Sequence, residues 1–325
     1  EPEPEPEPEP EIPDYPGEYM ALNENNTLIE EKIVSSDRAG GDRFGASVSI
    51  SGNYAIVGAD YEHAGGTTDA GSAYIFERDV DGSWNQMKKI QASDRGVEDY
   101  FGCSVSISGS YAIVGAWSED ANNTARRGAA YIFERNENGT WPATQTQKIQ
   151  ASDKASEDKF GVSVSISGNF AIVGADGKSD GKGAVYIFKR NENGTWPTTQ
   201  TQKIEATDKA NYDYFGRSVF INGSYIIVGA PFKKYNISGY NRSVGAAYIY
   251  ELNSNGSWSY KTKISASDKA EHDQFGCSVS ISETYAIIGS PYDDSTDRGA
   301  AYIFKRNQNG TWPTTQTQKI EATDK

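Results

Sequence analysis

The sequence predicts an all-β protein, a β-propeller of four-stranded antiparallel blades with five repeats in the chain. The first observation is a repeat: the stretch at residues 44–59 returns four more times, at a period of about 55 to 60 residues. Its Phe-Gly pairs begin at Phe44, Phe101, Phe160, Phe215 and Phe275. The second is that each unit reads as short strands separated by Gly and Asn turns. The third is that apolar residues at helical spacing do not recur, which argues against a helical repeat.

The first two strands of a unit are read from residues 44–59. Val48 and Ile50 alternate with serines, the period-two pattern of a strand with one apolar face. Gly52 and Asn53 supply a tight turn, because both residue types tolerate positive φ. The nearly continuous apolar run at residues 54–59 then predicts a second strand that is covered on both faces.

The third and fourth strands follow a loop that varies between units. Residues 73–76 make the third strand, and Asp81 and Gly82 turn the chain toward a fourth, at residues 89–94. We call the four strands of a unit A, B, C and D in chain order. Strand D is rich in Lys, Gln and Thr and suits an exposed outer edge. Four antiparallel strands, from a small-residue inner strand to a polar outer one, make a propeller blade.

The repeated pattern also resembles a known family. Phe-Gly-x-Ser-Val followed by Ile-Val-Gly-Ala, which closes at residues 228–231 as Val-Gly-Ala-Pro, is similar to the FG-GAP repeat, and the resemblance covers residues 32–318. It implies a propeller like that of the integrin α-chain head. Members of the family serve adhesion and scaffolding and include a few enzymes, so the resemblance implies the fold and not the activity.

Three segments are expected. Residues 1–18 form an acidic Glu-Pro tail that should run as extended polyproline II; residues 19–37 are a lead-in with an extra D-type strand; residues 38–325 are the propeller, with repeats that start near 32, 89, 148, 203 and 263. The tail holds eight acidic residues and no basic ones, so it accounts for −8 of the net charge of −14 and leaves −6 on the propeller. Nucleic acid and anionic membranes need a basic footprint, and a membrane span needs about 20 apolar residues, so neither kind of partner is expected.

The extra D-type strand leaves six such segments for five blades. A closed five-bladed ring, our first choice, would use one terminal D strand and leave the other free to pair with a neighbouring molecule. Alternatively the chain is an excerpt of a longer array of six or seven blades, or the spare strand frays or joins one blade as a fifth strand. A head-to-tail contact that does not close would propagate into a filament of copies of the chain.

Strand direction sorts the loops. The D-to-A and B-to-C loops belong on one face and the A-B and C-D turns on the other. The B-C loops differ most between units and carry aromatic side chains, as recognition surfaces on rigid scaffolds commonly do. Candidate ligand-binding residues there are Trp117, Phe232, Tyr235, Tyr240 and Tyr292.

Each D-to-A loop carries two aspartates five residues apart. The pairs are Asp37 and Asp42, Asp94 and Asp99, Asp153 and Asp158, Asp208 and Asp213, and Asp268 and Asp273. The resemblance implies calcium in an Asp-rich loop between the first two strands, but here that loop is only residues 51–53 and its copies, so no metal site is carried over. We expect these aspartates to accept backbone N–H groups of their own turns.

Catalytic residues are scarce. His63 and His272 lie in loops of different units, and Cys103 and Cys277 follow Phe-Gly pairs, where other units place ordinary inner-strand residues. A disulfide between nonadjacent blades is geometrically disfavoured. We therefore expect no enzyme activity, no catalytic residues, no metal and no cofactor.

Asn-x-Ser/Thr sequons are dense and point to a compartment. They are Asn25, Asn122, Asn138, Asn193, Asn222, Asn236, Asn241, Asn255 and Asn309. Four of them precede Gly in one duplicated hairpin turn, where Asn is ordinary turn chemistry. The sequence thus favours an extracellular or cell-surface glycoprotein, acting in adhesion or as a structural subunit of a surface fibre, with a protein partner or copies of itself. The alternative is a ligand- or carbohydrate-binding, or carbohydrate-active, propeller that uses the B-C loop aromatics.

Overall fold

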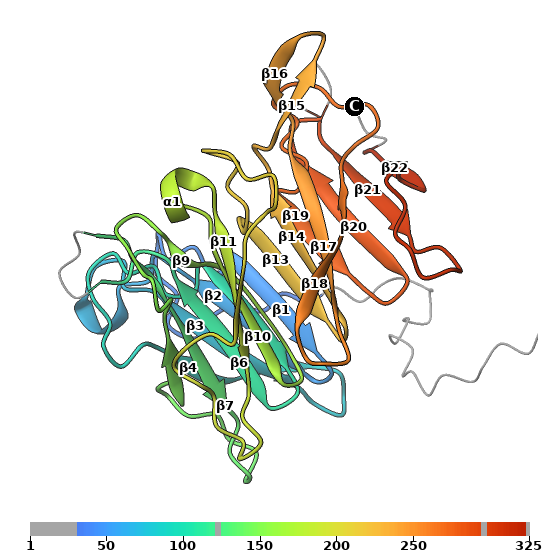
Figure 1. The fold of residues 1–325 in the computed structure, drawn as a ribbon. Helices are drawn as coiled ribbons and strands as arrows, with labels where there is room; N and C mark the ends of the chain where they lie inside the picture. Colours follow the sequence, from blue (N-terminus) through green and yellow to red (C-terminus); the bar gives the residue numbers. More distant parts are fainter. Residues whose placement is uncertain (1–30, 121–124, 294–297, 323–325) are drawn as a thin grey trace, which may run out of the picture. The chain divides into compact units, whose positions relative to one another are not determined.

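The computed structural model describes residues 31–120, 125–293 and 298–322. The chain divides into two units, residues 1–33 and residues 34–325. The second unit is a five-bladed β-propeller of four-stranded antiparallel sheets, as predicted, and helix is almost absent from its described residues (Figure 1). None of the helices among the described residues is long and apolar enough to cross a membrane.

Each blade is one sheet with its strands in chain order. Blade 1 comprises β1 (Ser47–Ser51), β2 (Tyr54–Ala59), β3 (Ser72–Arg78) and β4 (Trp84–Ile90). Blade 2 comprises β5 (Ser104–Ser108), β6 (Tyr111–Ala116), β7 (Ala129–Glu134) and β8 (Gln147–Ile149). Blade 3 comprises β9 (Phe160–Ser167), β10 (Phe170–Ala175), β11 (Ala184–Lys189) and β12 (Gln202–Ile204).

Blade 4 contains an insertion. Its blade strands are β13 (Ser218–Asn222), β14 (Tyr225–Ala230), β17 (Ala246–Leu252) and β18 (Trp258–Ile264), and its B-C loop forms a separate hairpin of β15 (Lys234–Ile237) and β16 (Tyr240–Ser243). Blade 5 comprises β19 (Ser278–Ile281), β20 (Tyr285–Ser290), β21 (Ala300–Lys305) and β22 (Gln318–Ile320). Two short turns complete the elements, η1 (Ala64–Gly66) and α1 (Lys178–Gly181).

The predicted strands are observed, and their pairing register agrees with the residue pattern of the sequence. In blade 1, Val48 pairs with Val57 and Ile50 with Ala55 across the predicted Gly52-Asn53 turn, and Gly52 has a φ of 56° there. The second strand is covered on both faces, since Ile56 and Val57 are buried. Strand D is the polar outer strand in every blade.

The core lies between blades rather than inside them. Four clusters of buried side chains join blades 1 and 2, 2 and 3, 3 and 4, and 4 and 5. In each, the Phe of the Phe-Gly pair and the Tyr of the third strand pack edge to face, as Phe101 and Tyr131 do at 5.4 Å between ring centroids. Each blade therefore needs a neighbour to bury its apolar face.

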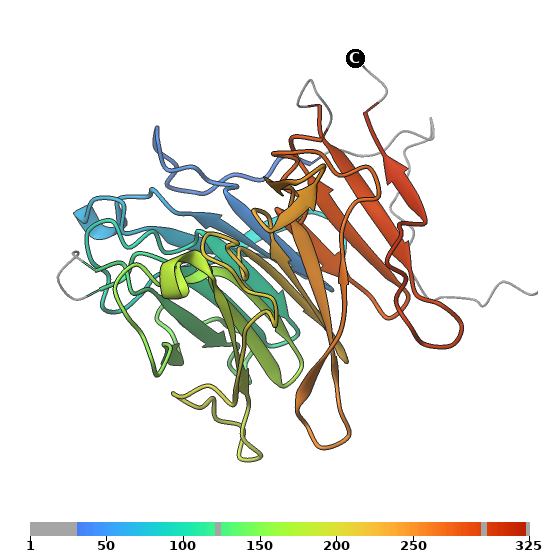
Figure 2. The ribbon, with the colours of Figure 1, turned by 45° about the horizontal axis from the view of Figure 1, so that its top comes forward.

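The loops sort as predicted. The D-to-A loop of one blade hydrogen-bonds the B-C loop of the preceding blade, for example from Tyr100 N to Asp69 O at 3.1 Å. In blade 4 the β15–β16 hairpin lies at one end of the sheet and the β17–β18 turn at the other (Figure 1). Figure 2 shows the same succession of blades, from blue to red, in a second direction.

The terminal D-type segments differ in the described part of the chain. Blade 5 is completed by its own C-terminal strand, β22, which pairs with β21. The described part of the N-terminal segment, residues 31–35, forms no strand, and residues 25–30 lie outside the described residues. Of the two terminal D strands, the C-terminal one thus completes blade 5.

Candidate functional site

The first aspartate of each D-to-A pair ties that loop to the next blade. Its two carboxylate oxygens accept a hydrogen bond from the tyrosine hydroxyl of the third strand and from the lysine of the fourth strand of that blade. For Asp153 these partners are Tyr186 at 2.7 Å and Lys203 at 2.8 Å. The same arrangement recurs at Asp37, Asp94, Asp208 and Asp268. Five loops therefore brace five blades through one repeated contact.

The second aspartate of each pair is buried and serves its own turn. Its Oδ2 accepts the backbone N–H three residues earlier at 2.5 to 2.7 Å, in the turn just ahead of Phe-Gly. This confirms the predicted structural role for Asp42, Asp99, Asp158, Asp213 and Asp273. In the part of the chain that the structure describes, no group of three or more His, Cys, Asp or Glu side chains is arranged to hold a metal ion.

The pKa values of Asp153 and Asp99 are shifted in opposite directions. Burial by itself disfavours the ionised form of Asp153, but the bonds from Lys203 and Tyr186 outweigh it and hold the pKa at about 2. Burial dominates at Asp99, where it raises the pKa to about 6 against the hydrogen bond from the Gly96 N–H; the Glu119 charge adds to the rise.

A third set of charges anchors the B-C loops, and no residue pattern predicted it. The buried charged side chains that make these contacts are Glu62, Glu119, Lys178, Lys233 and Asp293; Asp60 and Asp176 are also buried in B-C loops, beside Arg43 and Arg217. In blades 1, 2 and 5 the acid meets the fourth-strand lysine at 2.6 to 2.9 Å. In blades 3 and 4 the sign is reversed, and the buried lysine meets the second aspartate of the D-to-A pair at 2.8 and 2.9 Å. These acids and lysines are thus engaged in structural contacts.

The predicted aromatic residues fall into separate environments. Trp117 stacks on Tyr100 with ring centroids 5.2 Å apart and planes 3° apart, and Tyr100 contacts Tyr61 at 5.0 Å. We call these three residues the aromatic stack. Cations cover both ends of it: Arg43 lies over Tyr61, and Arg126 and Lys159 lie over Trp117.

The other four candidates belong to blades 4 and 5. Phe232 packs edge-on against Tyr214 at 5.4 Å. Tyr235 packs against the core between blades 3 and 4, so it is a structural residue as well as a loop residue. Tyr240 on β16 and Tyr292 are exposed. The five predicted residues therefore do not share one contact group.

A backbone conformation explains why the sequence did not predict that Tyr100 and Lys159 contact Trp117. The residue before each Phe-Gly pair adopts a left-handed conformation, with φ between 53° and 57° at Arg43, Tyr100, Lys159, Tyr214 and Gln274. A non-glycine residue seldom adopts this conformation, and sequence pattern alone gives no sign of it. It places the side chains before Phe-Gly beside the B-C loops, which is why Tyr100 and Lys159 meet Trp117.

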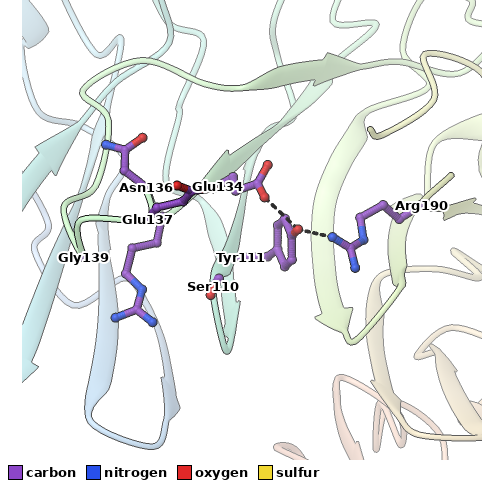
Figure 3. Close-up of a pocket in the computed structure, with 8 residues that line it drawn as sticks. Ser110, Tyr111, Glu134, Asn136, Glu137, Gly139 and Arg190 are labelled. Atoms are coloured by element: carbon purple, nitrogen blue, oxygen red, sulfur yellow. Dashed lines mark hydrogen bonds between the residues drawn. The ribbon is translucent and has the colours of Figure 1, made fainter. Parts of the chain in front are cut away.

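Neighbouring blades are also joined through a tyrosine at the start of the second strand. Tyr111 of blade 2 donates to Glu134 of its own blade at 2.8 Å and accepts a hydrogen bond from Arg190 of blade 3 (Figure 3). These residues border a hollow of about 530 Å³. The set recurs as Tyr54 with Glu77 and Arg135, and as Tyr225 with Glu251 and Arg306.

The backbones of successive blades approach too closely for side chains. A Cβ on Gly58 would lie 2.0 Å from the carbonyl oxygen of Gly102 in the next Phe-Gly pair. Gly115, Gly174 and Gly229 meet the next blade at the same 2.0 Å. The glycine of the second strand is therefore a requirement of blade-to-blade packing.

Blades 2 to 5 each pack one face against the preceding blade, and we call this the incoming face. The incoming face of blade 1 is open to solvent. Val48 is 69% exposed and Ile50 is 66% exposed. Their counterparts in blades 2 to 4 are at most 7% exposed: Val105, Ile107, Val164, Ile166, Val219 and Ile221. A Cβ on Gly45, the first Phe-Gly glycine, would have no neighbour within 4 Å, whereas a Cβ on any of its four copies would clash with or crowd the preceding blade.

Blades 1 to 4 each pack their other face against the following blade, and we call this the outgoing face. The outgoing face of blade 5 is also open to solvent. Ile287 is 42% exposed, whereas its counterparts Ile56, Ile113, Ile172 and Ile227 are fully buried. A hollow of about 580 Å³ lies on this face, bordered by Tyr285, Ile287 and Ile303 among others. The expected closure of the ring by packing of blade 5 on blade 1 is therefore not observed, since both faces remain open to solvent.

Comparison with known proteins places this repeat. The family described as FG-GAP repeat matches residues 29–76, 84–133, 143–188, 198–250 and 258–304. The chain belongs to the FG-GAP repeat family. Each matched segment of this FG-GAP chain ends in the third strand of a blade, and the last four begin at or before the fourth strand of the preceding blade.

The other comparisons add little. Among solved structures the FG-GAP chain is similar to the periplasmic gluconolactonase PpgL of Pseudomonas aeruginosa, with 15% identity over 86% of this chain and 85% of that chain and a TM-score of 0.45. A likeness of this size carries no argument about activity. The comparison with curated proteins found no match.

The structure also locates the cysteines, one histidine and the sequon asparagines singled out in the sequence of this FG-GAP chain. Cys103 and Cys277 are free thiols just before β5 and β19, as expected for inner-strand residues. His63 accepts the Asp69 N–H within its own loop. Seven sequon asparagines are exposed, namely Asn138, Asn193, Asn222, Asn236, Asn241, Asn255 and Asn309, whereas Asn25 and Asn122 lie outside the described residues.

Proposed function

We propose that this chain is a non-enzymatic extracellular glycoprotein that acts in adhesion or as a structural subunit of a surface assembly. The observation that carries the proposal is the pair of open end faces. A repeat whose core lies between modules leaves apolar surface at each end of the row unless a partner covers it. Val48 and Ile50 at one end and Ile287 at the other are such surface.

The acidic side chains support a scaffold role over catalysis. The D-to-A aspartates brace loops and blades, and the buried charges of the B-C loops are paired. Asp94 and Glu119 do border a hollow of about 280 Å³, but Lys148 Nζ contacts both carboxylates, at 2.6 and 2.7 Å, whereas a general acid or base must be free to meet a substrate. The contacts of these carboxylates are those of a rigid frame.

An extracellular location is supported by the sequons. All seven described asparagines are exposed, so a glycan on any of them would project into solvent. Those in the Asn-Gly turns use Oδ1 to accept from the sequon hydroxyl, as Asn138 does from Thr140 at 2.7 Å. We include their glycosylation in the proposal.

The N-terminal region is the second proposed contact. Residues 1–30 lie outside the described residues, but the segment at residues 36–37 is fixed on blade 1 through Ser36 to Gln86 and Asp37 to Tyr74. We propose that the acidic tail and the D-type segment at residues 25–33 reach a neighbouring molecule from this anchor, by strand addition.

Light scattering tests the proposal. The native mass is measured for the full chain and for a chain that lacks residues 1–31, before and after enzymatic deglycosylation. We expect assemblies of the full chain, smaller ones after truncation, and a mass loss on deglycosylation. Monodisperse, unglycosylated monomers of the full chain at every concentration would contradict the assembly and glycoprotein proposals.

A second candidate function is ligand binding at the aromatic stack. The observation that favours it is the joining of loops from different blades into one partly exposed group with cations at both ends. Stacking on aromatic side chains is a common way to bind sugars and other flat surfaces. A glycan array probed with wild type and Trp117→Ala tests this: loss of binding with unchanged native mass would support a carbohydrate-binding propeller, and equal binding by both proteins would contradict it.

A further inference from the structure

The two open faces are the two halves of one interface. Every internal junction consists of an outgoing face and an incoming face, and this chain keeps one unused copy of each. In the junction of blades 4 and 5, Ile227 and Ile249 of blade 4 share a buried cluster with Ile281 of blade 5. The matching unused residues are Ile287 and Ile303 on blade 5 and Ile50 on blade 1.

Blade 5 repeats the outgoing face of blade 3. Residues 184–209 and 300–325 differ only at Val185, which is Ala301 in blade 5, and at Glu192, which is Gln308. The hollow on blade 5 therefore has third-strand and fourth-strand side chains like those that blade 3 offers to blade 4, whereas on the second strand Tyr285 stands in the position of Phe170. The junction of blades 3 and 4 is the template for what this face binds.

Blade 1 has the form of the blade that fills this template. Blades 1 and 4 share a long fourth strand that begins at a Gly-Ser-Trp sequence, β4 at Trp84 and β18 at Trp258. Both also carry a register shift between the third and fourth strands. The fourth strands of blades 2, 3 and 5 have only three residues. The fourth strand of blade 1 thus resembles that of blade 4, the blade that covers blade 3.

We propose that blade 1 of a second copy of this chain seats on blade 5, head to tail, with the contacts of the internal junctions. This rests on the assembly function proposed above and names its partner and surface. The second copy is favoured over other occupants because it supplies an incoming face of the required form. Among the described residues no blade covers these faces, since Val48, Ile50 and Ile287 all remain exposed.

The internal junctions specify the new contacts. At the junction of blades 1 and 2, the Ile107 N–H donates to Ser49 Oγ of the preceding blade at 3.2 Å, and Gly71 bridges to Phe101. In the head-to-tail pair, Ile50 N–H takes the place of the donor and Ser280 that of the acceptor. Gly299 then bridges to Phe44, and Gly45 packs on Gly289.

The outer edge of the face is already partly filled. Asp37 of the same copy accepts hydrogen bonds from Tyr74 and Lys89. In the other blades this position is occupied by the D-to-A loop that comes from the preceding blade. The new contact is therefore concentrated on β1 and β2 of one copy and on β19, β20 and β21 of the other. The segment after Ile320 must leave room for residues 34–37 of the neighbour.

One pair in the new junction is unfavourable, and it gives the sharpest test. Blade 5 carries Lys305 where blades 1, 2 and 4 carry Glu77, Glu134 and Glu251. In the junction, Lys305 and Tyr285 would face Arg78, the counterpart of Arg135 and Arg190. Lys305→Glu would recreate the Glu-Tyr-Arg set of Figure 3 and convert a repulsion into an attraction.

The experiment is analytical ultracentrifugation of the full chain over a concentration series, with three variants. Lys305→Glu should tighten self-association about tenfold, because a like-charge pair becomes an ion pair at an interface rim. Val48→Asp should weaken it at least about a hundredfold, because the junction would bury an unpaired charge. Val80→Asp is the matched control, since Val80 is fully exposed in the β3–β4 turn and lies off the face; it should change nothing.

The outcomes separate the two proposals. Self-association that responds to Lys305→Glu and Val48→Asp but not to Val80→Asp supports the head-to-tail contact. If the wild type self-associates and neither Lys305→Glu nor Val48→Asp changes its affinity, the assigned faces are overturned and the assembly function still stands. A monomer for both wild type and Lys305→Glu overturns the head-to-tail contact and the assembly function together. If circular dichroism shows that Val48→Asp does not fold, the effect of Lys305→Glu on self-association still tests the head-to-tail contact.

Discussion

Two isoleucines at the same position of different blades should differ sharply in what they contribute to stability. Ile113 in blade 2 is fully buried, and Ile287 in blade 5 is 42% exposed. Both lie in the second strand opposite an isoleucine of the third, Ile132 and Ile303. The difference between Ile113→Ala and Ile287→Ala therefore measures the presence of a covering blade.

The magnitudes follow from burial. Isoleucine to alanine removes three carbon groups worth about 0.8 kcal/mol each when buried, or about 2.4 kcal/mol. At Ile113 a cavity cost adds to this, for a total of about 3 to 4 kcal/mol. At Ile287 about three fifths of the area is buried and the site opens to solvent, so no closed cavity forms and about 1.4 kcal/mol is expected.

Urea denaturation of dilute protein, followed by fluorescence, is the assay. The midpoint should fall for both variants at an unchanged dependence on urea, and by at least twice as much for Ile113→Ala. Equal costs for the two variants would refute the reasoning, because they would mean that blade 5 is covered in the single chain.

The remaining predictions concern pH. The pKa of Asp153 is about 2 when folded, below the ordinary 3.8, so its stabilisation is present above pH 4 and is lost as the pH falls toward 2. Asp153→Asn should thus lower the melting temperature at pH 7, with a difference from wild type that shrinks in acid; a difference independent of pH would contradict the assigned ion pair. The pKa of Asp99 is about 6 when folded, above 3.8, so ionisation costs stability as the pH rises from 4 to 6. Asp99→Asn should flatten the stability profile in that window and keep the protein at least as stable at pH 7, and an unchanged profile would contradict the burial of this carboxyl.

Local patterns predicted the local structure. The alternation around Val48 and Ile50, the turn at Gly52 and the apolar second strand indicated the strands and their register, because each depends only on neighbours in sequence. The role of Asp99 was also predictable, since its partner is the N–H of Gly96, three residues away.

Contacts between blades were harder to predict. Asp153 meets Tyr186 and Lys203, 33 and 50 residues further along, so its role depends on how one blade sits against the next. The stacking of Tyr100 on Trp117 depends in addition on a left-handed backbone conformation that no residue pattern reveals.

The open seam could not be read from the repeat. A period gives the number of blades but not the rotation between them, and that rotation decides whether the last blade reaches the first. The expected closed ring was therefore wrong although the blades themselves were right. Ring closure depends on small differences in packing angle, which accumulate over four junctions.

Hydrogen exchange of the inner strands tests the central claim most directly. Amides of β5 and β9 are covered by the preceding blade, where Ile107 N–H and Ile166 N–H bond serine hydroxyls; the corresponding amide of Ile50 lies on the open face. In dilute protein we expect β1 to exchange much faster than β9, and at high concentration to become protected together with β20. Protection of β1 equal to that of β9 in the dilute monomer, or fast exchange of β1 at every concentration, would contradict an open propeller completed by its neighbours.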